Sequence, residues 1–113
     1  MNEDDLFRLR HMLDAAREAI LLAQGSTRKT LDSDRKLVLA LIADLSIIGE
    51  AASRVTREFQ AAQPQVPWAA LVGMRNILVH AYFRVDLDVV WDAVAKDLPD
   101  LIPKLEALIS TGG

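Results

Sequence analysis

Residues 37–52 read LVLALIADLSIIGEAA, and this stretch decides the fold. Its large apolar side chains recur at steps of three and four residues, which places them on one face of an α-helix. The stripe comprises Leu37, Leu41, Leu45, Ile48, Ala52, Val55 and Phe59. Val38 and Ile42 widen it, so we expect this helix to bury more than one side. We predict a long helix over about Ser33 to Ala62. Gly49 lies in its middle, where glycine costs about 1 kcal/mol relative to alanine, so we expect a close helix crossing there; a glycine tolerated without purpose is the alternative.

The same helical spacing continues on both sides of this stretch. We predict further helices over about residues 3–24, from Trp68 to about Tyr82, and from Leu87 onward, with Pro99 either breaking the fourth or starting a fifth. Candidate N-caps stand at the expected starts: Asn2 or Asp4, Ser33 beside Asp34, and Asp86. Gly25 could end the first helix. Short connections between helices predict an all-α, antiparallel helical bundle in one domain, residues 1–113.

Composition narrows the class of protein. Apolar residues make up 51% of the chain, which a small helical domain cannot fully bury, so we expect a subunit interface, most simply a homodimer. The chain has no cysteine and therefore no disulfide or thiolate metal site. No apolar run is long enough to cross a membrane, and the acidic start is the wrong charge for an export signal. We expect a cytoplasmic protein.

Net charge is −3, which argues against broad binding to DNA or other polyanions. The charge is uneven, because residues 26–85 carry eight basic and five acidic groups while both ends are acidic. Any contact with a polyanion is then local and would include Arg75. Scattered surface charge without function is the alternative.

One short segment, Arg75-Asn76-Ile77-Leu78-Val79-His80-Ala81-Tyr82, gathers the chemistry-bearing residues. Asn76 and His80 are four apart and share a helix face. Arg75 and His80 are separated by about 140° and about 7.5 Å, so a long arginine must curl round to reach the same phosphate. Arginine binds phosphate, and histidine transfers protons near neutral pH.

These residue types suit metal-independent RNA cleavage, which needs a base for the 2′-hydroxyl, an acid for the leaving 5′-oxygen and a cation for the charged transition state. One motif histidine per chain suggests that acid and base come from two copies across a dimer axis. The plainer alternatives are a core histidine and a half-buried packing tyrosine. We interpret His11 as a surface residue. For Asp44 and Glu50 the plain alternatives are a solvated face or a hydrogen bond between helices. We predict no metal site.

Arg75-Asn76-x3-His80-x-Tyr82 resembles the Arg-x4-His-x-Tyr motif of HepT-like toxins, a branch of the HEPN ribonuclease superfamily. The resemblance covers about residues 33–100 and includes further segments: Ile47 to Ala52, Pro67-Trp68, Gly73 to Asn76, Tyr82-Phe83-x-Val85-Asp86 and Val90-Trp91.

The resemblance implies a homodimeric HEPN-like bundle and a toxin of a type VII toxin-antitoxin system. It implies an endoribonuclease without cofactor, acting on RNA such as tRNA or mRNA, and silenced by an MntA-type nucleotidyltransferase antitoxin that transfers AMP to Tyr82 (AMPylation). It assigns Arg75 to phosphate binding, His80 to acid-base catalysis and Asn76 to a polar helper role, with Glu50 as a possible support. Arg84 stands where glycine is expected, and either adds charge at the cleft edge or has no role. The alternative is a non-catalytic helical partner, or substrate-binding subunit, of a nucleotidyltransferase.

Overall fold

The computed structural model describes residues 1–76 and 86–112, and within these ranges every regular element is a helix. The elements are α1 (Glu3–Ala23), η1 (Arg28–Asp32), α2 (Arg35–Arg54), α3 (Arg57–Ala62), α4 (Trp68–Gly73), α6 (Leu87–Asp92), η2 (Ala93–Asp97) and α7 (Leu98–Gly112). None of these helices is long and apolar enough to cross a membrane. The predicted all-α class is confirmed.

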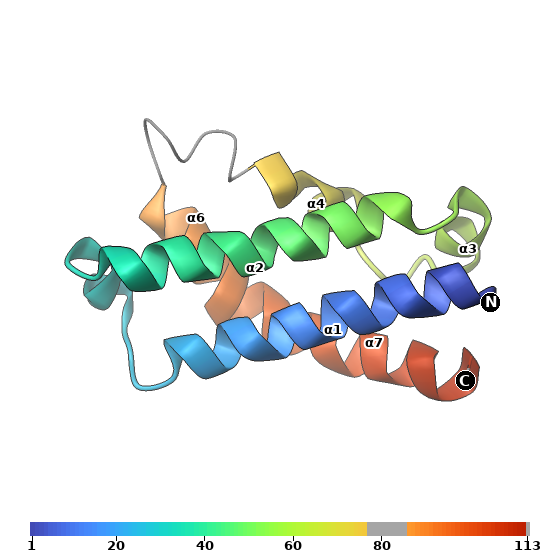
Figure 1. Cartoon of the computed structure of the whole chain (residues 1–113), viewed down its shortest axis with the longest axis horizontal. Coiled ribbons are helices and arrows are strands. Elements are labelled where there is room, and N and C mark those ends of the chain that lie inside the picture. The colour runs from blue at the N-terminus through green and yellow to red at the C-terminus, as the bar shows by residue number, and fades with distance from the viewer. Residues whose placement is uncertain (77–85, 113) are drawn as a thin grey trace.

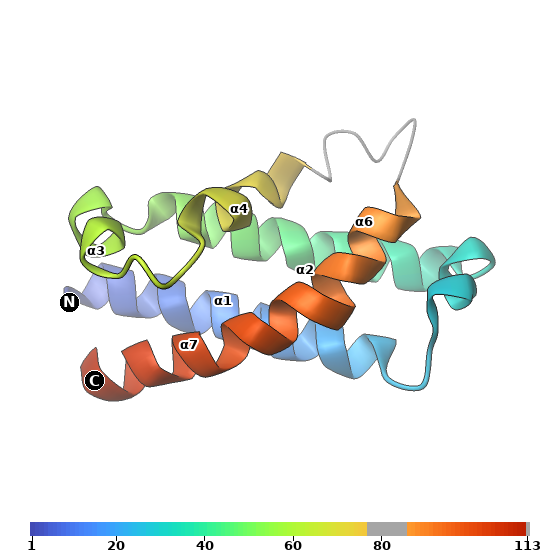
Figure 2. The same cartoon turned by 180° about the vertical axis from the view of Figure 1, so that it is seen from behind.

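The helices form two layers. α1 and α2 lie side by side and antiparallel in one layer, and α4, α6 and α7 pack behind them (Figures 1 and 2). Both termini lie at the same end of the molecule. In the described part of the chain, no helix covers the opposite face of the α1–α2 pair, which faces the viewer in Figure 1.

The core lies between the two layers and is built from aliphatic side chains. Its fully buried members include Leu9 and Met12 of α1, Leu41, Leu45 and Ile48 of α2, Val90 of α6, and Leu98 and Leu105 of α7. Leu41, Leu45 and Ile48 belong to the stripe that predicted the central helix. Their burial removes apolar surface from water and holds the layers together.

The prediction of one helix over residues 33–62 is wrong, because α2 ends at Arg54 and a separate helix, α3, begins at Arg57. The buried carboxylate of Asp5 accepts hydrogen bonds from the Thr56 amide (2.9 Å) and the Thr56 hydroxyl (2.7 Å). The same hydroxyl oxygen accepts from the amide of Phe59 and caps α3. A tertiary contact from α1 therefore breaks a helix that the apolar stripe alone would continue.

Most predicted helix ends are confirmed. Asn2 accepts a hydrogen bond from the amide of Asp5 and caps α1, and Asp86 caps α6. Gly25 follows the end of α1 with φ +80°, a backbone conformation that favours glycine. Ser33 is not the N-cap of α2: Asp34 caps it instead, by accepting from the amide of Leu37.

Pro99 does not break the C-terminal segment. The π-helical turn η2 precedes it, and Pro99 lies in the first turn of α7. This agrees with the predicted alternative in which Pro99 starts a fifth helix. The wider turn accommodates a proline ring that would clash with the preceding turn of a regular α-helix.

The predicted helix from Trp68 to Tyr82 is observed only in part. α4 begins at Trp68 as predicted, Met74 forms a turn, and helical backbone resumes at Arg75 and Asn76. Its remainder, up to Tyr82, lies outside the described residues.

Candidate active site

Gly49 lets α2 and α4 approach each other at the site. A Cβ atom on this residue would lie 2.5 Å from the Arg75 amide nitrogen, 2.9 Å from the Leu71 carbonyl oxygen and 3.0 Å from the Arg75 Cβ. No side chain fits there without movement of the backbone. The predicted close helix crossing at Gly49 is confirmed, and its consequence is that Arg75 lies directly over α2.

Glu50, the next residue of α2, joins two arginines. Its Oε1 accepts a hydrogen bond from Arg54 Nε at 3.0 Å, and its Oε2 lies 3.6 Å from Arg75 Nη1. The hydrogen bond from Arg54 is the main cause that holds the pKa of Glu50 below its usual value, and the charge of Arg75 adds to it. Because these side chains are about half exposed, the ion pairs contribute little stability. Their effect is to orient two guanidinium groups that remain accessible to a ligand.

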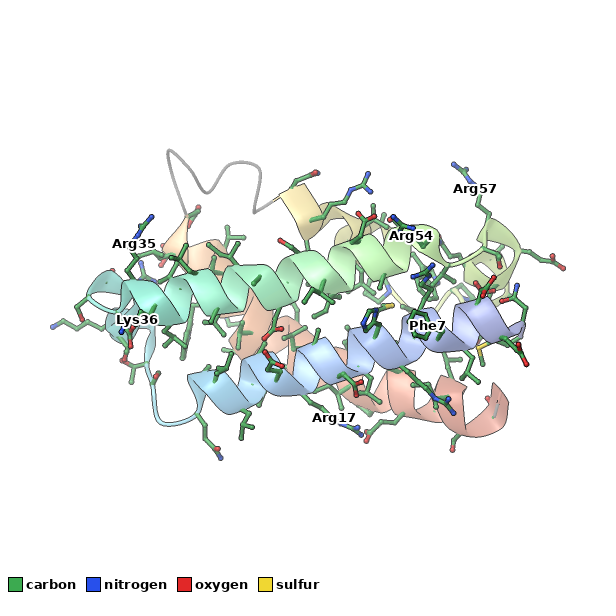
Figure 3. All side chains as sticks on the ribbon, in the orientation of Figure 1. Phe7, Arg17, Arg35, Lys36, Arg54 and Arg57 are labelled. Atoms are coloured by element: carbon green, nitrogen blue, oxygen red, sulfur yellow. The ribbon has the colours of Figure 1, made fainter. Side chains whose placement is uncertain are left out.

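These residues line one groove, of about 660 Å³. Its lining residues are Arg8 and His11 from α1, Ser46, Ile47, Glu50, Ala51 and Arg54 from α2, and Arg75 and Asn76 after α4. Three arginines and one glutamate give the lining a charge of +2 when His11 is neutral. Figure 3 shows Arg54 of α2 and Phe7 of α1 at the same end of the helix pair. A cationic groove with exposed guanidinium groups can bind phosphate on a chain whose net charge is −3.

The structure thus brings together three of the predicted site residues, Arg75, Asn76 and Glu50. His80, Tyr82 and Arg84 lie outside the described residues, so the predicted shared face of Asn76 and His80 stays a prediction. Within residues 1–76 and 86–112, no three histidine or carboxylate side chains gather in a way that could hold a metal ion.

Three basic side chains of the groove, Arg8, His11 and Arg54, were not predicted as site residues from the sequence. His11 is exposed, as predicted, but it also faces the same groove as Arg75. Nothing in the sequence connects Arg8 or His11 to a motif more than 60 residues further along the chain. Arg54 carried a usable signal, since it stands one helical turn after Glu50.

Asp44 is not on a solvated face, which corrects one of its two predicted alternatives. Its side chain is only 3% exposed, and its Oδ2 has no hydrogen-bond partner among the described residues. Burial first, and then the nearby carboxylate of Glu18 on α1, raise its pKa from 3.8 to about 6. The folded chain then retains a proton that the unfolded chain releases, so this group destabilises the fold as pH rises from about 4 through 6.

Comparisons with known proteins show the family to which the chain belongs. The family model described as Ribonuclease HepT-like matches residues 12–108. The chain belongs to this family. A protein of Thermococcus cleftensis named "Probable ribonuclease HepT" is 39% identical over 100 residues, which cover 85% of this chain and 91% of that protein. A Methanocaldococcus jannaschii protein named "Putative RNase MJ1380" is 33% identical, covering 84% and 87%.

A third relative, from Caldanaerobacter subterraneus subsp. tengcongensis, is named "Putative RNase TTE0752" and is 31% identical, covering 89% of this chain and 90% of its own. No solved structure matches the chain significantly. The HepT-like family resemblance inferred from the motif around Arg75 is therefore confirmed.

Proposed function

We propose that this protein is a metal-independent endoribonuclease and the toxin of a toxin-antitoxin system. The observation that carries the proposal is the exposed Arg75 guanidinium in a cationic groove, in a chain that belongs to the ribonuclease HepT-like family. Three relatives that align with most of the chain have names that include ribonuclease or RNase. RNA is the polyanion that such a groove would bind.

In the proposed reaction, a histidine removes the proton from the RNA 2′-hydroxyl, and the resulting oxygen attacks the adjacent phosphorus. The bond from phosphorus to the 5′-oxygen breaks, and an acid protonates that leaving oxygen. The products are a 2′,3′-cyclic phosphate and a free 5′-hydroxyl. His80 performs the proton transfers, Arg75 stabilises the charge on the phosphorus oxygens, and Asn76 holds a phosphate oxygen.

Glu50 has a supporting role in this proposal. Its carboxylate pairs with both Arg75 and Arg54 and would keep their guanidinium groups oriented before substrate arrives. Preorientation matters, because charge stabilisation is most effective when the donors need no rearrangement during the reaction.

We further propose that the active form is a homodimer in which the motif histidine of one copy serves as base and that of the other as acid. Exposed apolar side chains support an interface between copies: Leu21, Leu22, Leu39, Ile47 and Val89. A two-fold axis would place two equivalent grooves, each with its own Arg75, beside one RNA chain.

Regulation would act through Tyr82. An MntA-type nucleotidyltransferase would transfer AMP to its hydroxyl, two residues beyond His80. The added phosphate would compete with RNA for Arg75, and its bulk would block His80. Arg84 would add positive charge at the same edge of the groove.

The test is RNA cleavage by the purified, unmodified protein in excess EDTA, with the ends of the products identified. Wild type should cut, His80→Ala should not, and Arg75→Ala should lose about a hundredfold in rate. Arg35→Ala is the matched control: this exposed arginine lies at the other end of α2 (Figure 3) and should leave cleavage unchanged. Cleavage by His80→Ala at the wild-type rate would refute the catalytic assignment.

Growth of cells that express the protein separates this proposal from the non-catalytic alternative. A toxin should arrest growth, and co-expression of the neighbouring nucleotidyltransferase should relieve the arrest while adding the mass of AMP to Tyr82. A nucleotidyltransferase subunit without ribonuclease activity would bind that partner and arrest nothing.

A further inference from the structure

Phe7, Arg8 and His11 form a small surface of α1 at the side of the groove. Phe7 is 54% exposed, although a phenylalanine gains free energy from burial. Its ring centroid lies 5.1 Å from that of His11, one helical turn later, and the guanidinium carbon of Arg8 lies 5.4 Å from the same ring centroid. The outer part of the Phe7 ring stays open to solvent.

This surface is continuous with the site. Arg8 and His11 line the same groove as Arg54, Arg75 and Asn76. Phe7 does not line the groove itself, but it contacts two residues that do. An exposed ring therefore stands at one rim of a cationic groove whose other rim carries the proposed catalytic arginine.

An exposed aromatic ring next to arginines is the combination that binds single-stranded RNA. Unpaired bases stack on aromatic rings, and the phosphates between them bind arginine. The positive charge of the lining favours RNA over a purely apolar protein partner as the occupant.

We propose that Phe7, Arg8 and His11 form a nucleotide subsite, in which a base of single-stranded RNA flanking the cleaved bond stacks on the Phe7 ring beside His11, while an adjoining phosphate binds Arg8. The proposal rests on the proposed ribonuclease function and deepens it: the preferred substrate is unpaired RNA, and the rate depends on a nucleotide outside the cleaved step.

The experiment measures the affinity of a short fluorescein-labelled single-stranded RNA by anisotropy, in a His80→Ala background that prevents cleavage. Phe7→Leu keeps the apolar character and removes the ring, and should weaken binding about tenfold. Phe7→Trp should bind at least as tightly as phenylalanine. Arg8→Gln should reduce the slope of log affinity against log salt by about 0.7, the value for one lost phosphate contact.

Arg17→Gln is the matched control for Arg8→Gln. Arg17 is an exposed arginine of the same helix, about 13.5 Å further along α1 than Arg8, and it pairs with Glu106 of α7 outside the groove, so its loss should leave RNA affinity unchanged. Circular dichroism verifies that each variant is folded, and light scattering gives the mass of the assembly.

The outcomes separate the subsite from the function. If wild type cuts RNA but Phe7→Leu binds as tightly as phenylalanine, the subsite is wrong and the ribonuclease proposal stands. If the protein neither cuts nor binds RNA, both fail. If Phe7→Leu changes the mass of the assembly, Phe7 is a contact between protein chains and the subsite is overturned.

Discussion

Replacing Gly49 by alanine tests the helix crossing on which the site depends. The new methyl carbon would lie 2.5 Å from the amide nitrogen of Arg75 and 2.9 Å from the carbonyl oxygen of Leu71. Ordinary contacts begin at 3.4 Å, so the two helices must separate by about 0.9 Å at this point. Both contacted atoms belong to the backbone, and no side-chain rotation can relieve the overlap.

The expected loss follows from two opposing terms. Alanine stabilises the middle of a helix by about 1 kcal/mol relative to glycine. Overpacking a tight contact costs about 1–3 kcal/mol. Because the obstacle here is backbone, the upper part of that cost applies, about 2–3 kcal/mol, and Gly49→Ala should lower the free energy of unfolding by about 1–2 kcal/mol. A shift of about 1 Å in Arg75 should also reduce RNA cleavage about a hundredfold.

Urea denaturation measures the stability term, with tryptophan fluorescence as one probe because the buried Trp68 begins α4. The midpoint should fall by about 0.5–1 M. Gly73→Ala is the matched control: Gly73 ends α4, and its added Cβ would meet no atom of the described residues within 4 Å. That variant should keep or slightly raise the stability. If Gly49→Ala proves as stable and as active as Gly73→Ala, the crossing does not constrain Arg75 and the reasoning fails.

Three further predictions concern other contacts. Because the pKa of Asp44 is raised to about 6, Asp44→Asn should increase the free energy of unfolding by about 1–3 kcal/mol at pH 8 and leave it nearly unchanged at pH 4. Urea denaturation at both pH values measures this, and a variant less stable than wild type at pH 8 would contradict it. Asp5→Ala should lower the free energy of unfolding by about 2–4 kcal/mol, because two hydrogen bonds from Thr56 are lost. Asp4→Ala, on the exposed side of the same turn, should lower it by less than about 1 kcal/mol in the same urea denaturation. Equal effects of the two substitutions would show that Asp5 does not hold the start of α3. Glu50→Gln should change the free energy of unfolding by less than about 0.5 kcal/mol, because its ion pairs are half exposed. It should slow RNA cleavage about tenfold, since Arg75 loses its orienting partner, and leave RNA affinity equal or higher, since the groove gains positive charge. A loss of affinity without a loss of rate would refute this role.

Local patterns predicted most of the helices, because a helix depends on neighbours three and four residues away. Asn2, Gly25 and Asp86 stand where the chain itself must cap or turn, and each does so in the structure. The break after Arg54 could not be predicted, since it depends on Asp5, which is 51 residues from Thr56 in the sequence.

The candidate site, like the fold, could be predicted from the sequence only in part. The sequence by itself determined the family, through the motif around Arg75 and Asn76, and it marked Gly49 as a close crossing. Only the tertiary structure decided that this crossing sets Arg75 over Glu50, and that Arg8 and His11 of α1 line the same groove. The physical reason is that a sequence motif contains only the residues of its own segment. The charge of the groove, and the position of the exposed Phe7 ring beside it, depend on α1, α2 and α4 packing together.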